Sequence, residues 1–522
     1  MIAAGIAVVT ALLAVMALTP ATARIARRLG ALDTPDGLRK HQIQAVPRGG
    51  GVAVAIATGL ALAVALPWAV HAWGATSSAM ARGLLPAALI LLAVGVVDDF
   101  FSLTGIYKLI GQVLAVSVMV AVGTRFDSIT ILGWPLPLGS FCIPFTMFFF
   151  LGAINAFNLI DGADGLAASV GAIVSLTLGV IAATQGGLVA SLLCFSMAGA
   201  LLGFLRYNLP PARVYLGDTG SMFIGLVVAA VAIQCSIKQQ AAFVLSVPVA
   251  ICAIPILDAG AALVRRITTG QSVFMADRGH LHHALLLRGW TVGQTVALIA
   301  GLTALTCSGA LASYFTSNDV FALIATVGIF GALAGARIFG HAEAALLAFH
   351  SRSLVRTIMM QRAVRNSITE NSVRLQGTRK WQNVWAALRE AAPTYNVAGL
   401  TLHVNMPQLH ESFYANWRLN DGVALEDHWK IVLPLMLGER PIGKLTLLGG
   451  STGRQTLVDM QQLLDYLESL EADIAQIVAD NELMEWNKAN IQPVCVGDGQ
   501  GDELQSAGAG LLEVSQTVQL TD

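Results

Sequence analysis

Long apolar stretches alternate with short polar connections over roughly the first two thirds of the chain, and a more polar sequence follows them. A helix needs about 20 apolar residues to cross a hydrocarbon core of about 30 Å, and about eleven such stretches precede residue 340. They lie at 2–20, 50–70, 83–98, 109–123, 141–158, 165–184, 187–204, 220–236, 241–260, 293–315 and 319–338. The pattern therefore predicts an all-α polytopic membrane protein with about 11 transmembrane helices.

From about residue 340 the pattern changes, because charged residues return and long apolar runs stop. Two segments, 379–391 and 456–480, are predicted to be helical, and strands are expected at 398–404, 428–437 and 442–448. We therefore predict three regions along the chain. They are a multi-span domain at 1–340, a C-terminal α+β domain at 350–485 and a disordered tail at 490–522.

Composition supports a membrane protein and excludes one class of partner. Of the 522 residues 55% are hydrophobic and only 12% are charged. The mean hydropathy is +0.67. The formal net charge of −1 provides no global basic field for nucleic acid, so any charge that matters must be local.

The basic residues predict the orientation of the chain. Arg24, Arg27 and Arg28 follow the first apolar run and none precedes it, the reverse of the charge order in a signal peptide. Lys and Arg then concentrate in alternate connections, namely 21–49, 99–108, 159–164, 205–219 and 261–292. The positive-inside rule predicts that the N-terminus lies outside and that the C-terminal domain lies in the cytoplasm.

Polar residues gather in these same connections. The first, at 32–50, contains Lys40 and His41 among Pro and Gly residues, and it is either an ordinary basic loop or a contact for an anionic ligand. The second contains the adjacent carboxylates Asp98 and Asp99 at the end of an apolar span, followed by Lys108. Two carboxylates next to hydrocarbon either face solvent or are neutralised by a cation, and oxygen ligands of this kind suit Mg²⁺ or Mn²⁺.

The third cluster interrupts very apolar sequence. Asn155, Asn158, Asp161 and Asp164 recur every three residues, which places them along one side of a helix end or its first loop turn. Packing alone does not account for four polar groups on one stripe. We therefore interpret them as ligand contacts.

The last two clusters complete the same side. Asp218 lies between Gly217 and Gly220 just before an apolar span, where backbone amides suit phosphate, although a simple turn and cap is the alternative. Arg278 precedes three histidines at 280, 282 and 283, which indicate either phosphate contacts or a zinc site. Five such clusters on one side describe phosphoryl chemistry on a lipid substrate, with a carboxylate-bound divalent metal.

At these residues the chain resembles the polyprenyl-phosphate N-acetylhexosamine-1-phosphate transferases, over about residues 25–290. The motifs that carry the resemblance are RKH at 39–41, VDDF at 97–100, NAFNLIDGADGLA at 155–167, LGDTGS at 216–221 and DRGHLHH at 277–283. The HLHH form is more similar to the undecaprenyl-phosphate N-acetylglucosamine-1-phosphate transferases than to the muramoyl-pentapeptide branch. No motif of the family is evident in the C-terminal domain.

The resemblance implies a multi-pass protein of the bacterial inner membrane, a reaction and a set of functional residues. UDP-N-acetylglucosamine, or another UDP-N-acetylhexosamine, would be the donor, undecaprenyl phosphate the acceptor, and UMP the released product. Mg²⁺ or Mn²⁺ would be bound by Asp98, Asp99 and Asp218. Catalytic roles are expected for Asp98, Asp99, Asp161, Asp218, His280, His282 and His283. Substrate binding is expected for Lys40, His41, Lys108, Asn155, Asn158, Asp164 and Arg278.

Several alternatives stay open at this point. In one mechanism, which we favour, Asp98 or Asp99 helps to deprotonate the lipid phosphate, which then attacks directly. In the other, a carboxylate attacks first and forms a covalent intermediate. A transporter also has many spans and intramembrane polar residues, and a membrane sensor would place the function in the tail. The tail is also a candidate contact for downstream glycosyltransferases of cell-surface polysaccharide synthesis, such as that of lipopolysaccharide O-antigen. A homodimer is compatible with the sequence.

Overall fold

The computed structural model describes most of the chain. The described residues are 2–33, 45–73, 79–131, 134–238, 246–269, 279–359, 367–376, 380–406, 409, 411–420, 428–437, 440–450, 461–468, 470 and 474–479. The chain divides into two compact units, Met1–Leu463 and Leu464–Asp522. The predicted domain boundary near residues 340–350 therefore stays a prediction, and the predicted disordered tail lies outside the described residues.

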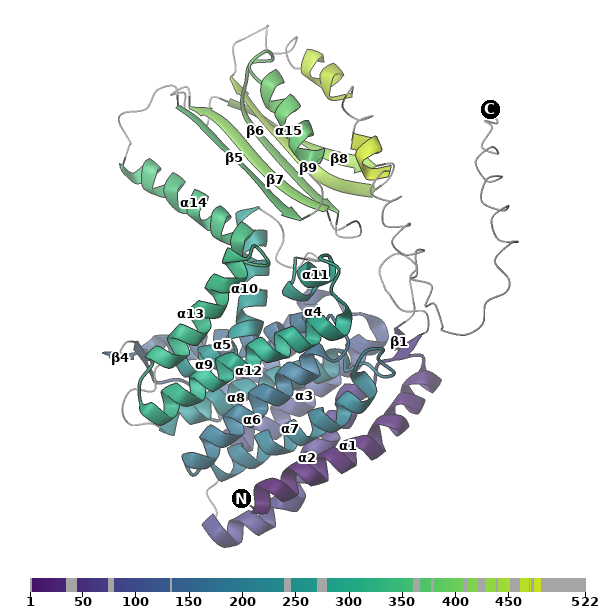
Figure 1. The fold of residues 1–522 in the computed structure, drawn as a ribbon, viewed down its shortest axis with the longest axis vertical. Coiled ribbons are helices and arrows are strands. Elements are labelled where there is room, and N and C mark those ends of the chain that lie inside the picture. Colours follow the sequence, from purple (N-terminus) through teal and green to yellow (C-terminus); the bar gives the residue numbers. More distant parts are fainter. Residues whose placement is uncertain are drawn as a thin grey trace, which may run out of the picture. The chain divides into compact units, whose positions relative to one another are not determined.

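Helices dominate the N-terminal part of the structure (Figure 1). They are α1 (Ile2–Leu29), α2 (Gly50–Trp73), α3 (Ala79–Phe101), α4 (Gly105–Ala121), α5 (Cys142–Ile160), α6 (Leu166–Thr184), α7 (Leu188–Asn208), α8 (Gly217–Lys238), α9 (Ser246–Ile251), α10 (Ala253–Thr268), α11 (Leu281–Leu286), α12 (Val292–Thr316), α13 (Val320–Gly335) and α14 (His341–Met359). Short strand pairs join β1 (Leu32–Asp33) to β2 (Val46–Pro47) and β3 (Ser128–Ile131) to β4 (Trp134–Pro137), and a 3₁₀ turn, η1 (Gly139–Phe141), precedes α5.

Within the described residues, eight helices are long and apolar enough to cross a membrane: α1, α2, α3, α5, α6, α7, α8 and α12. Two more apolar helices, α4 and α13, are shorter than the usual span. The multi-span prediction is therefore confirmed in kind, whereas the number of about eleven is not established.

The predicted span 241–260 differs from the structure. Residues 246–268 form two helices, α9 and α10, which meet at Cys252. Proline lacks a backbone N–H, and Pro248 and Pro255 lie on either side of this junction. A continuous apolar run is therefore divided into two shorter helices.

Helix α8 lies at the centre of the bundle, with 89% of its apolar window buried, and it contacts α2, α3, α5, α6 and α7. Small residues allow the close packing. A side chain at Gly225 would clash with the backbone of Ile154 in α5, and one at Gly95 would clash with the backbone of Thr219. The ends of α3, α5 and α8 are consequently held close together, and these ends carry three of the predicted polar clusters.

The C-terminal part contains an antiparallel five-stranded sheet in the order β5-β7-β6-β9-β8. Its strands are β5 (Ser367–Gln376), β6 (Val397–Met406), β7 (Glu411–Asn420), β8 (His428–Leu437) and β9 (Arg440–Gly450). Helix α15 (Lys380–Ala391) buries Trp381, Val384, Trp385 and Leu388, and Figure 1 shows it lying along the sheet. Residues 461–468 and 474–479 are helical.

The helix predicted at 379–391 and the strands predicted at 398–404, 428–437 and 442–448 are all present. Strands β5 and β7 were not predicted. In β7 the residues Phe413, Ala415 and Trp417 are buried in alternation with less buried neighbours, which is a period-two pattern that the sequence does contain.

Candidate active site

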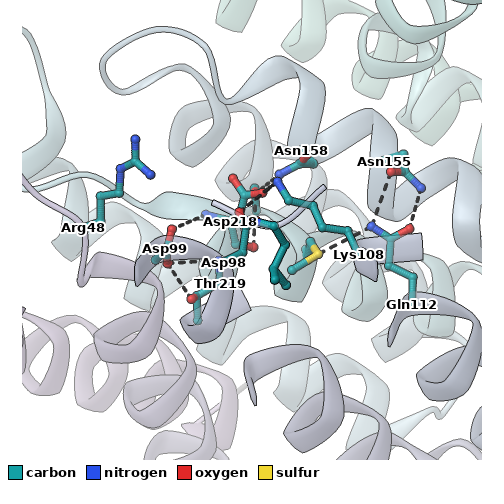
Figure 2. Close-up of polar contacts among 12 residues, drawn as sticks. Arg48, Asp98, Asp99, Lys108, Gln112, Asn155, Asn158, Asp218 and Thr219 are labelled. Carbon is teal, nitrogen blue, oxygen red and sulfur yellow. Dashed lines mark hydrogen bonds and ion pairs between the residues drawn. The ribbon is translucent and has the colours of Figure 1, made fainter. Parts of the chain in front are cut away.

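The carboxylate of Asp99 links the end of α3 to the start of α8. It accepts hydrogen bonds from the amide of Asp218 (3.1 Å), the amide of Thr219 (3.4 Å) and the hydroxyl of Thr219 (2.6 Å) (Figure 2). The first amides of a helix lack partners within the helix and favour a negative charge. Asp99 therefore stabilises the N-terminus of α8 from a neighbouring helix.

Gly217 is required at this junction. Its φ is +71°, which side chains rarely adopt, and a Cβ there would lie 2.7 Å from both carboxylate oxygens of Asp99. A glycine therefore lets the carboxylate approach the first turn of α8 closely.

Lys108 of α4 bridges two other carboxylates. Its Nζ lies 2.8 Å from Oδ2 of Asp98 and also hydrogen-bonds to Oδ2 of Asp218 (Figure 2). The other oxygen of Asp98 accepts from the amide of Leu103 at 2.7 Å, which fixes the turn between α3 and α4. The ammonium group thus occupies a position between two acidic side chains, where a cation is electrostatically favoured.

The amides of the third cluster also have partners. Nδ2 of Asn158 donates to Oγ of Ser221 in α8 at 3.0 Å. Asn155 and Gln112 of α4 exchange hydrogen bonds at 2.8 and 3.3 Å, and Asn155 also donates to the carbonyl of Leu151 at 2.8 Å. The polar stripe of α5 is therefore joined to both α4 and α8.

The two aspartates of this cluster differ. Asp164 accepts from the amide of Ala212 at 2.9 Å, and burial raises the pKa of its carboxyl despite this bond. For Asp161 the described residues provide no hydrogen-bond partner. Burial, and then the negative charges of Asp218 and Asp99, raise the pKa of Asp161 well above its usual range. Asp161 is thus the carboxyl group most available to a ligand or a proton.

The histidines lie beside the loop that contains Asp161. The rings of His280 and His282 are stacked with centroids 5.8 Å apart, and the ring of His283 lies 4.2 Å from that of His282. A Cβ added at Gly162 would be 2.6 Å from Nε2 of His282. His282 is buried with neither ring nitrogen hydrogen-bonded among the described residues, and burial lowers its pKa to about 4.

The first cluster joins the site through its second half. The amide of Tyr215 donates to the carbonyl of Pro47 at 3.0 Å. The backbone of Arg48 forms an isolated parallel β-bridge with Tyr215, and its side chain forms an ion pair with Asp33. Burial lowers the pKa of Arg48, but the hydrogen bond and charge of Asp33 raise it more. Lys40, His41 and Arg278 lie outside the described residues.

The described parts of the five clusters therefore lie in contact with one another, whereas the roles of Lys40, His41 and Arg278 stay predictions. The sequence did not single out three of the residues that join the clusters. Ser221 and Thr219 belong to the LGDTGS motif, in which hydroxyls near a helix start are a recognisable capping signal. Asp258 of α10 hydrogen-bonds to His280. Its position in the sequence, a carboxylate inside a predicted apolar span, could have marked it as functional.

No group of three or more His, Cys, Asp or Glu side chains in the described part of the chain has the arrangement of a metal site. The donor chemistry nevertheless fits a hard cation. Asp98 and Asp218 direct oxygens toward one shared cation, the ammonium of Lys108, whereas Asp99 is engaged by the amides of α8. Asp98 and Asp218 are consequently the pair of the three predicted ligands that is best placed to hold a metal ion.

Carboxylates that share a cation, an aspartate without a hydrogen-bond partner among the described residues and a histidine cluster lie together at the ends of apolar helices. Such a site is typical of a membrane-embedded enzyme of phosphate transfer. Comparison with known proteins identifies the family. The model of glycosyl transferase family 4 matches residues 81–236.

Among curated proteins, the probable undecaprenyl-phosphate N-acetylglucosaminyl 1-phosphate transferase of Bacillus subtilis is 32% identical over 57% of this chain and 82% of its own length. The decaprenyl-phosphate N-acetylglucosaminephosphotransferase of Mycolicibacterium smegmatis is 32% identical over 58% of this chain and 80% of its own. The undecaprenyl-phosphate alpha-N-acetylglucosaminyl 1-phosphate transferase of Escherichia coli K12 is 30% identical over 56% and 79%. The chain belongs to the polyprenyl-phosphate N-acetylhexosamine-1-phosphate transferase family.

Proposed function

We propose that this enzyme transfers N-acetylglucosamine 1-phosphate from UDP-N-acetylglucosamine to undecaprenyl phosphate. An oxygen of the lipid phosphate forms a bond to the sugar-bearing phosphorus of the donor. The bond from that phosphorus to the bridging oxygen breaks, and UMP leaves with that oxygen. The printed names of the relatives support the sugar and the lipid phosphate, and the positive-inside pattern favours the cytoplasmic face.

The observation that carries this proposal is that the carboxylates of Asp98 and Asp218 both contact the ammonium group of Lys108. A diphosphate brings several negative charges, and these need cations that acidic residues can hold in place. Mg²⁺ or Mn²⁺ held by Asp98 and Asp218 would offset the charge that develops on the departing UMP. Lys108 would remain beside the phosphates as a fixed positive charge.

Other residues of the site have roles that follow from their surroundings. Asp161 has a raised pKa and no described partner, so it is suited to take or hold a proton at the acceptor phosphate. The histidines at 280, 282 and 283 lie next to the loop of Asp161, where their ring nitrogens can exchange a proton or hydrogen bonds with the phosphate groups. Asn155 and Asn158 connect the helices around the site, and the nucleotide would contact this stripe.

The C-terminal sheet region is proposed to modulate the enzyme or to bind a downstream glycosyltransferase, since no predicted catalytic residue belongs to it. The product would then serve the synthesis of cell-surface polysaccharide, such as O-antigen, at the bacterial inner membrane. A homodimer would be compatible with either role.

Purified protein incubated with Mg²⁺, radiolabelled UDP-N-acetylglucosamine and undecaprenyl phosphate tests the reaction. We expect label in the lipid fraction and an equal amount of UMP. The Asp98→Asn variant should lose both products, whereas Asp127→Asn, whose side chain is 74% exposed, is the matched control and should retain them. Competition with other UDP-N-acetylhexosamines identifies the sugar. No labelled lipid and no UMP from folded protein would contradict the proposal.

A further inference from the structure

Helix α10 carries a buried carboxylate that belongs to none of the motifs described above. The side chain of Asp258 is 3% exposed. A carboxylate that is removed from water needs hydrogen bonds to both of its oxygens, because an unpaired buried charge is strongly unfavourable. Its partners therefore indicate what this residue does.

Both oxygens of Asp258 contact the segment that begins α11. Oδ1 accepts from the amide of Leu281 at 2.7 Å, and Oδ2 lies 2.9 Å from Nδ1 of His280. His280 is the residue that precedes α11, and its own side chain does not cap the helix. Asp258 thus fixes both the start of this short helix and the ring of its first histidine.

The contact also determines which nitrogen of His280 carries a proton. An ionised carboxylate can only accept hydrogen bonds, so Nδ1 of His280 must be the donor. In a neutral imidazole the other nitrogen, Nε2, then has no proton. Nε2 is consequently left as the atom that can accept a proton or a hydrogen bond from a substrate.

The ring held in this way is part of the histidine cluster beside the proposed reacting groups. It stacks on His282 with an angle of 5° between the ring planes. His282 in turn lies against Gly162, which follows Asp161. A rotation of His280 would therefore disturb the packing next to Asp161.

We propose that Asp258 is a positioning residue for phosphate transfer, which orients His280 and keeps its proton on Nδ1 so that Nε2 can accept a proton or a hydrogen bond from the acceptor phosphate. The role rests on the proposed function, since it acts through a histidine of that site.

The Asp258→Asn variant separates this role from simple packing. Asparagine has nearly the same shape, and its carbonyl oxygen can still accept from the amide of Leu281. Its NH₂ group would face Nδ1 of His280 as a donor, so the proton of the ring would have to move to Nε2. A merely structural role would be largely preserved in this variant.

Nitrogen NMR of protein labelled with ¹⁵N-histidine in lipid nanodiscs measures the tautomer directly, and the His280→Gln variant assigns the signal. We expect the Nδ1–H form in the unmodified protein and the Nε2–H form in Asp258→Asn. The Nε2–H form in the unmodified protein would overturn the proposal, and that measurement does not depend on any substitution of Asp258.

Kinetics give the second measurement. Loss of the orienting partner of a metal-bound histidine typically costs roughly ten-fold to a hundred-fold. We expect kcat of Asp258→Asn to fall by at least about ten-fold, with a much smaller change in donor KM. In a His280→Ala background the same substitution should have almost no further effect. Full activity of Asp258→Asn beside an inactive His280→Ala would overturn the positioning role alone. An unmodified protein without activity would instead contradict the proposed function.

Discussion

The hydroxyl of Thr219 donates a 2.6 Å hydrogen bond to the carboxylate of Asp99, and this contact joins the start of α8 to the end of α3. Both residues are buried. The position of Asp218, which follows directly after the glycine at the start of α8, therefore depends on a pair of residues that need not touch a substrate.

Replacing Thr219 with Val should lower both stability and activity. Valine has a similar volume but no hydroxyl, so Asp99 would keep only its two backbone donors. A hydrogen bond to a charged group is worth about 1.5–3 kcal/mol, and we expect a loss of this order in thermal unfolding together with reduced turnover. Thr306→Val is the control, because among the described residues the buried hydroxyl of Thr306 bonds only within its own helix, to the carbonyl of Thr303. Equal effects of the two substitutions would contradict a special role for the Thr219–Asp99 contact.

Lys108→Met should reduce turnover and tighten the binding of a divalent cation. The ammonium of Lys108 lies between Asp98 and Asp218, so its removal leaves two carboxylates that repel each other and attract a cation more strongly. The fixed positive charge beside the phosphates is lost at the same time. Binding of Mn²⁺, followed by electron paramagnetic resonance, measures the first effect and product formation measures the second.

Lys108→Arg keeps the charge and serves as the matched variant for Mn²⁺ binding. Weaker Mn²⁺ binding in Lys108→Met than in the unmodified protein would mean that the lysine and the metal do not compete for the same carboxylates.

The sequence predicted where polar groups gather but not how they pair. Asp98 and Lys108 lie on consecutive helices joined by a short turn, so their proximity follows from the chain itself. The bond between Asp258 and His280 joins α10 to α11 across segment 270–278, which has no apolar periodicity that would orient one helix to the other. Such contacts depend on tertiary packing.

The sequence also contains local signs of helix breaks, but the prediction of spans gave more weight to hydropathy. The apolar character of 241–260 predicts one span, although Pro248 and Pro255 already indicate a break and Asp258 is costly inside a membrane. In the C-terminal sheet, β5 is rich in polar residues, and its place next to β7 depends on pairing with that strand. Its sequence alone therefore does not identify it as a strand.

The ion pair between Arg265 of α10 and Glu343 of α14 should be required for stability. Both side chains are largely buried, at 8% and 10% exposure. Breaking a buried ion pair by removing one partner typically costs about 3–5 kcal/mol. We therefore expect Glu343→Gln to lower the thermal unfolding midpoint strongly. A small effect of Glu343→Gln would contradict the stabilising role of this pair.

The same contact predicts how much of the tail the transferase needs. A chain that ends after Phe349 retains Glu343, the partner of Arg265, and it should keep its activity. A chain that ends after Phe339 loses Glu343 and should be unstable in detergent. Equal stability of the two truncated chains, measured by thermal unfolding, would contradict the role of α14.

Asp161 predicts a link between metal concentration and the pH dependence of the reaction. Its pKa is raised by burial and by the charges of Asp218 and Asp99. A carboxyl with a raised pKa holds its proton to higher pH, so activity that needs the ionised form falls as pH decreases through that raised pKa. A divalent cation bound beside Asp98 and Asp218 offsets the negative charge and lowers the pKa of Asp161.

The acidic limb of kcat/KM against pH should therefore move to lower pH as Mg²⁺ is raised from limiting to saturating concentration. Asp161→Asn should have little activity and no such limb. An acidic limb whose position does not depend on Mg²⁺ would show that the titrating group is not coupled to the metal-binding carboxylates.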